Sequence, residues 1–198
     1  MANFRDYLFT RSQVTTMVVD QNSGNYLWIA YTAVAGECLI QKVSAFDLTQ
    51  VFFSVSLPVT SINDMKILGT FLYVAVIHAT IAVYKISVTN PLSSQTTYTK
   101  TTLGITESPI AITISSPVVY FLTPGTISGE NSKLVLFTSG NYDETVDLTE
   151  SAILIDNAVS LTVDGDDNIW IVTSDDPANL YRVFFQSGGW HIQETILS

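Results

Sequence analysis

The residues best suited to hold an ion lie in DGDDNIWIVTS, residues 164–174. Asp164, Asp166 and Asn168 have the spacing of the first three ligands of an EF-hand loop, and their carboxylate and amide oxygens are ligands that Ca²⁺ prefers. However, Ile169 stands where that loop requires glycine, and strand-forming residues follow it. The pattern therefore excludes an EF-hand and leaves two interpretations, an Asp-rich turn or an irregular surface calcium site. Calcium is the one cofactor that the sequence suggests.

Residue arrangements that would indicate catalysis are scarce. The chain has two histidines, His78 and His191, and contains no HExxH, CxxC or GxSxG motif. The paired acids Asp143–Glu144 and Asp175–Asp176 fall in expected loops, where two carboxylates would be available as acid and base. With only 8 Lys and Arg, little besides backbone N–H groups or a metal would stabilise a developing oxyanion. We therefore expect no enzyme, and the enzymatic alternative is a calcium-dependent hydrolase or lyase.

Aromatic side chains are the other candidates for contact with a ligand. Tyr142 and Trp190, if exposed on one face, would form a platform on which a sugar ring stacks. Aromatic residues in strands also serve as cross-strand packing pairs. The sequence leaves both interpretations open.

The chain that carries these residues has the pattern of β-strands nearly throughout. Short runs of Val, Ile, Thr, Phe and Tyr alternate with turn clusters. Four strand cores share a central aromatic residue at intervals of 45, 47 and 50 residues, namely Trp28, Tyr73, Tyr120 and Trp170. One apolar strand precedes each of them and two follow, and a basic residue recurs in three of the third strands, at Lys42, Lys85 and Arg182. A unit of four strands in about 45 to 50 residues has the size of a β-propeller blade.

The last repeat resembles the repeat of two-component-regulator-type propellers. Residues 164–183, DGDDNIWIVTSDDPANLYRV, share with that family an Asp-rich turn, Asn-Ile-Trp-Ile, a short loop and a Leu-Tyr-Arg-like third strand. Residues 20–43 match less closely, through Asp20, Asn25, Trp28 and Ile29. The two middle repeats keep only the strand rhythm. The resemblance implies that Asp164 to Asn168 form the turn between the first two strands of a blade, with Trp170 packed between adjacent blades. It implies no activity.

We therefore predict an all-β fold, a β-propeller of about four four-stranded blades forming a single domain over residues 14–198. The blades are expected at approximately 14–57, 58–104, 105–152 and 153–198, and residues 1–13 are expected to be an N-terminal extension or docking strand. A propeller hides its sheet edges by closing its ring. The alternatives are therefore a β-sandwich, or half of a larger propeller that oligomerisation completes.

Composition limits the partners. The net charge is -10, and the few basic residues argue against nucleic acid and anionic membranes, because phosphate binding requires clustered basic side chains. No apolar run is long enough for membrane insertion, and the N-terminal residues lack the apolar core of a signal peptide. The single cysteine, Cys38, is expected to be a buried thiol.

Low charge and abundant Ser, Thr and Asn make the composition similar to that of β-rich bacteriophage virion proteins. The first hypothesis is a non-enzymatic structural or binding module of a virion (a phage tail, fibre or capsid accessory protein), assembled in the host cytoplasm. Its partners would be other protein subunits, with self-association included, and a soluble cytoplasmic protein is the alternative location. The second hypothesis is a carbohydrate-binding or receptor-binding propeller that uses Tyr142 and Trp190.

Overall fold

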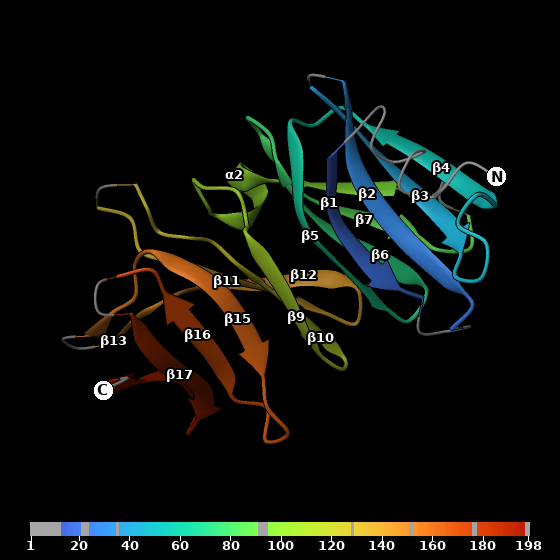
Figure 1. Cartoon of the computed structure of the whole chain (residues 1–198). Coiled ribbons are helices and arrows are strands. Elements are labelled where there is room, and N and C mark those ends of the chain that lie inside the picture. The colour runs from blue at the N-terminus through green and yellow to red at the C-terminus, as the bar shows by residue number, and fades with distance from the viewer. Residues whose placement is uncertain are drawn as a thin grey trace. The chain divides into compact units, whose positions relative to one another are not determined.

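The computed structural model describes residues 13–20, 24–34, 36–90, 95–127, 129–150, 153–175 and 178–196 (Figure 1). The predicted N-terminal extension or docking strand, residues 1–13, lies outside these residues except for Gln13, which begins the first strand.

Four sheets of four strands account for most of the described chain, and in each the strands follow one another in chain order. Blade one holds β1 (Gln13–Val19), β2 (Tyr26–Val34), β3 (Glu37–Ser44) and β4 (Val51–Leu57). Blade two holds β5 (Ser61–Leu68), β6 (Phe71–Ile77), β7 (Ile81–Ser87) and β8 (Gln95–Thr99). Blade three holds β9 (Ala111–Ser115), β10 (Val118–Leu122), β11 (Lys133–Thr138) and β12 (Asn141–Asp147). Blade four holds β15 (Ala158–Val163), β16 (Ile169–Thr173), β17 (Asn179–Gln186) and β18 (Gly189–Ile196).

Two connecting elements were not predicted. The fourth strand of blade two, β8, ends at Thr99, and the chain continues as one helical turn, α2 (Lys100–Leu103). Thr99 caps this turn, since its hydroxyl accepts from the N–H of Thr102, and Gly104 ends it in the left-handed conformation. A two-stranded hairpin, β13 (Thr149–Glu150) and β14 (Ile153–Leu154), connects blade three to blade four.

The chain divides into two compact units, Met1–Tyr98 and Thr99–Ser198. In the first unit, blades one and two pack face to face around one hydrophobic core. Its fully buried members include Trp28, Ile40 and Leu57 of blade one and Met65, Leu72 and Ile86 of blade two. Cys38 lies in the same core, where burial raises the pKa of its thiol, so the predicted buried cysteine is confirmed.

In the second unit, blades three and four share a separate core. Its fully buried members include Leu122 and Leu134 of blade three and Ile169, Ile171 and Val183 of blade four. Leu148 and Ile155, which flank the β13–β14 hairpin, are buried in it too. The hairpin thus brings apolar residues into the core between the two blades.

The four repeated aromatic residues alternate in their relation to these cores. Trp28 and Tyr120 belong to the two cores. Tyr73 and Trp170 do not, because each lies between two core residues of its strand and successive side chains of a strand point to opposite faces. Trp170 therefore lies on the face of blade four turned away from the core of its unit, and its packing between adjacent blades stays a prediction.

Candidate functional site

The turn between β15 and β16 is organised around the carboxylate of Asp164. Its Oδ1 accepts from the backbone N–H groups of Asp166 (2.9 Å) and Asn168 (3.0 Å), and its Oδ2 accepts from Nε1 of Trp170 (2.8 Å). The side-chain amide of Asn168 donates to both oxygens. These donors, that of Trp170 first, hold the pKa of Asp164 well below its usual value. The predicted turn is confirmed, with Asp167 supplying its left-handed residue (φ 61°).

A line of side chains runs from this turn across the sheet. The Asn168 Oδ1 accepts from Nη2 of Arg182 (2.8 Å), which stands directly across from Trp170 on the neighbouring strand. The Arg182 guanidinium lies 4.8 Å from the ring centre of Phe184, whose ring lies 5.6 Å from that of His191. The arginine is therefore held on two sides, by an amide and by an aromatic face.

Of the side-chain oxygens predicted to bind calcium, those of Asp164 and Asn168 already accept hydrogen bonds from the protein. Asp164 accepts four side-chain and backbone donors, and Asn168 Oδ1 accepts from Arg182. Across the described ranges, no three His, Cys, Asp or Glu side chains gather as they would to hold a metal ion. No finding tests calcium binding directly, and it stays a prediction.

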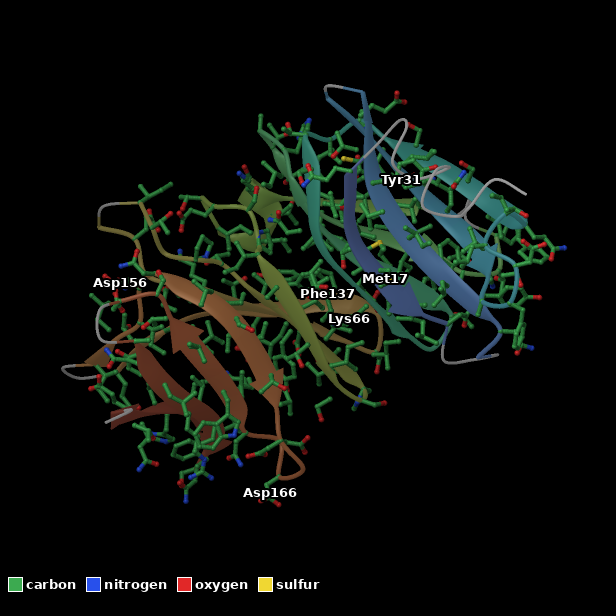
Figure 2. The ribbon with its side chains drawn as sticks, viewed as in Figure 1. Met17, Tyr31, Lys66, Phe137, Asp156 and Asp166 are labelled. Carbon is green, nitrogen blue, oxygen red and sulfur yellow. The ribbon has the colours of Figure 1, made fainter. Side chains whose placement is uncertain are left out.

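A cavity of about 480 Å³ lies in the second unit, where the β15–β16 turn approaches the β17–β18 hairpin. Its aromatic lining consists of Tyr120, Phe184, Phe185 and Trp190. Its polar lining consists of Asp166, Asp167, Asn168, Arg182 and Gln186. Figure 2 labels Asp166 on the turn at the edge of blade four. Tyr120 and Asp167 line the cavity together, and burial and the charge of Asp167 raise the pKa of Tyr120.

Of the two aromatic residues predicted to contact a ligand, Trp190 lines the cavity and Tyr142 does not. The Nε1 of Trp190 donates to Glu144 (3.0 Å). Tyr142 is half-buried on β12 and packs edge-on against Phe137.

The sequence did not single out Phe185, which lines the cavity beside Trp190. The signal was the run QSGGW, because a two-residue turn at Ser187–Gly188 places Phe185 directly across from Trp190. The sequence marks Arg182 as a recurring basic residue of the third strands and does not indicate that it lines a cavity.

The remaining titratable candidates have structural partners. His191 Nδ1 lies 2.9 Å from Glu150 Oε1, which raises the pKa of His191. Glu150, whose pKa is lowered mainly by the N–H of Ile192, thus ties the β13–β14 hairpin to β18. His78 accepts two backbone N–H groups in the β6–β7 turn. Asp143 and Glu144 were expected in a loop but lie on β12.

Blade one carries an exposed apolar surface, which we call the blade-one face. It comprises Val14, Met17 and Val19 on β1 and, less accessible, their cross-strand partners on β2, of which Tyr31 and Leu27 are half-buried and Ile29 is buried. The side chains on β1 are 40%, 64% and 50% exposed. Met17 and Tyr31 are labelled in Figure 2. β1 is also one of the two edge strands of its sheet among the described residues.

No protein-family profile matches the chain, and no curated protein matches it in sequence. Several solved structures match its fold. The WD40 domain of Pan2 from Neurospora crassa matches with a TM-score of 0.60 and 10% identity, over 93% of this chain and 50% of that one. The β-propeller domain of Cps50 (Swd1) from Myceliophthora thermophila matches with a TM-score of 0.51 and 12% identity, over 94% and 55%. The extracellular domain of a hybrid two-component system from B. thetaiotaomicron matches with a TM-score of 0.56 and 12% identity, over 96% and 22%.

These likenesses show the fold, and the predicted all-β propeller of four-stranded blades is confirmed. The chain spans about half the length of the first two structures. Half of a larger ring, completed by oligomerisation, stays a prediction. In the described part of the chain, no helix has the length and apolar character needed to cross a membrane.

Proposed function

We propose that the protein is a non-enzymatic assembly module that associates with a second copy of itself through the blade-one face. The observation that carries this proposal is the exposure of Val14, Met17 and Val19 on one face of one strand. Contiguous exposed apolar side chains on a soluble protein are typical of protein–protein interfaces. Burial of such surface stabilises a complex by about 25 cal/mol per Å² before the cost of association is subtracted.

The chemistry of the blade-one face favours a second copy as the occupant. None of its six side chains is charged, so two copies of it meet without like-charge repulsion at the contact, even though each chain carries a net charge of -10. A two-fold arrangement places the same surface of both subunits together. It also covers part of β1, an edge strand of its sheet among the described residues, and proteins rarely leave such strands unprotected.

The proposal extends to a structural subunit of a virion, such as a phage tail, fibre or capsid accessory protein. The composition supports it, with 13% charged residues and net acidic charge. The fold supports only the wider class of binding modules, because propellers host many unrelated functions.

The test is the mass of the native chain by sedimentation over a range of concentrations up to about 100 μM, where an interface worth about 5.5 kcal/mol is half-populated. We expect a concentration-dependent dimer that Val19→Lys abolishes. Val159→Lys is the matched control, because Val159 is 48% exposed on the first strand of blade four, as Val19 is 50% exposed on that of blade one. A wild-type monomer throughout, or a dimer that Val19→Lys leaves intact, would overturn the proposal.

A further inference from the structure

We propose that the cavity of blade four is a binding site for a neutral saccharide. This inference concerns the second unit and does not depend on association through blade one. It rests on the kinds of side chain that the cavity brings together.

The aromatic wall presents rings in fixed orientations. Phe185 and Trp190 face each other across the β17–β18 pair, with ring centres 5.4 Å apart and planes at 71°. The Trp190 ring is anchored by its bond to Glu144. Phe185 is nevertheless 61% exposed, which is unusual for a phenylalanine that serves only to pack. An exposed ring beside an anchored one gives a surface for the apolar face of a sugar ring.

The polar wall offers both acceptors and donors. Asp166 and Asp167 supply carboxylates, and Gln186 supplies an amide. Asp167 is held in place by the hydroxyl of Ser115 and lies close to Tyr120. Sugar hydroxyls both donate and accept, and they form stronger hydrogen bonds with carboxylates than with neutral groups. A few fixed polar groups beside an apolar wall are what such a ligand requires.

Charge selects among ligands of this kind. The two carboxylates of the turn repel a phosphate or an acidic sugar. Arg182 also lines the cavity, and its charge weakens the attraction that the aromatic rings and the two carboxylates have for an organic cation. A neutral hydroxylated ligand meets neither penalty.

Binding is tested by isothermal titration calorimetry on the whole chain with glucose, galactose, mannose and N-acetylglucosamine, each up to about 50 mM. N-acetylneuraminic acid and choline are titrated alongside as the anionic and cationic probes. We expect at least one neutral sugar to bind saturably, and neither charged probe to bind.

Two substitutions locate the site. Phe185→Ala should weaken binding about tenfold, the loss expected for one stacking ring. Asp166→Asn should also weaken it, whereas the Asp166 backbone N–H that bonds to Asp164 is unaffected. Phe46→Ala is the matched control, because Phe46 is an 84% exposed phenylalanine in blade one. Unchanged thermal unfolding would show that the variants are folded.

Two results would overturn the proposal. One is the absence of binding by all four neutral sugars, with choline binding instead pointing to a cation site. The other is sugar binding that Phe185→Ala leaves unchanged. Neither result bears on association through the blade-one face, which is read from Val19→Lys.

Discussion

Blade one and blade four begin in the same way and then diverge at one position. Asp20 follows the first strand of blade one, and its backbone N–H closes the turn on the carbonyl oxygen of Tyr26 (2.9 Å). Asp164 follows the first strand of blade four and closes its turn on the carbonyl oxygen of Asn168 (3.0 Å). Tyr26 and Asn168 are therefore equivalent, although the turn of blade one is two residues longer.

The residues that follow are equivalent too. We call Tyr26 and Asn168, whose carbonyl oxygens close the two turns, the closing position. Trp28 and Trp170 each follow it by two residues. They lie directly across from Lys42 and Arg182 on the third strands. Each blade thus places an acid, a tryptophan and a base at matching points of the sheet.

In blade one the acid and the base pair directly. Asp20 Oδ2 lies 2.8 Å from Lys42 Nζ, and the side chains are 3% and 13% exposed. The Lys42 ammonium also lies 4.4 Å from the ring centre of Tyr26. The Nε1 of Trp28 is buried without a hydrogen-bond partner among the described residues.

In blade four an amide stands between the acid and the base. Asp164 accepts the N–H of Trp170, and Asn168 bridges Asp164 to Arg182. The unpartnered buried atom here is Nε of Arg182, again within the described residues. The residue at the closing position, Tyr26 or Asn168, thus determines which buried N–H group lacks a hydrogen-bond partner among the described residues: that of the tryptophan in blade one or that of the arginine in blade four. A tyrosine ring attracts the lysine beside the acid, whereas an asparagine amide binds the planar fork of the arginine.

The largest effect is expected from Asp20→Asn, which leaves a mostly buried ammonium without its anion. We expect the free energy of unfolding at pH 7 to fall by about 3–5 kcal/mol. Urea denaturation followed by tryptophan fluorescence measures it. Lys66→Gln is the control, because its pair with Asp64 is 3.7 Å long and Lys66 is 42% exposed, so it should cost less than about 1 kcal/mol. If the free energy of unfolding fell equally in the two variants, the buried Asp20–Lys42 pair would stabilise the protein no more than the exposed Asp64–Lys66 pair.

Asp164→Asn should have a smaller effect, because the blade-four turn is open to solvent. We expect the Tm at pH 7 to fall by a few degrees. The pKa of Asp164 is lowered in the folded state, so its contribution to stability is fully present above the unfolded value of about 3.9 and is lost as the pH falls further. Thermal unfolding at pH 7 and at pH 2 should therefore show the two proteins converging in acid. A constant difference would contradict this origin of the effect.

The smallest effect is expected at the position where the blades diverge. Tyr26→Leu removes the ring beneath Lys42 while keeping an apolar side chain, and the cation–π contact is worth about 0.5–1 kcal/mol. A double-mutant cycle with Lys42→Met isolates this contact from the edge-on packing of Tyr26 against Phe52. A coupling energy near zero would mean that Tyr26 acts only through that packing.

The sequence predicts the blades because strand period and turn chemistry are local signals. Trp28 and Trp170 mark their strands, and the Asp164–Asn168 turn is where the pattern places it. Other features depend on interactions that the pattern does not contain. The stretch around Lys100 is threonine-rich like its neighbouring strand, and only the cap at Thr99 with the following Gly104 makes it helical.

The cavity was only partly predictable. Trp190 was singled out and does line it, whereas Tyr142 does not. A register shift between Leu136 and Phe137 in the pairing of β11 with β12 alters how Tyr142 is presented, and a bulge of this kind has no signature in the sequence. The hydrogen bond from the Ser115 hydroxyl to Asp167 joins two blades and likewise follows from packing.

Each hydrophobic core is shared by two successive blades, and this has a consequence for how such a chain can be inherited. The sequence repeats once per blade, but a genetic deletion of one blade would leave half of a core facing water. Loss of blades one and two together, or of blades three and four together, would leave the other core complete. Gene recombination that preserves a folded protein is therefore expected to have its breakpoints near Tyr98 rather than at every repeat boundary. Related proteins would then differ by pairs of blades.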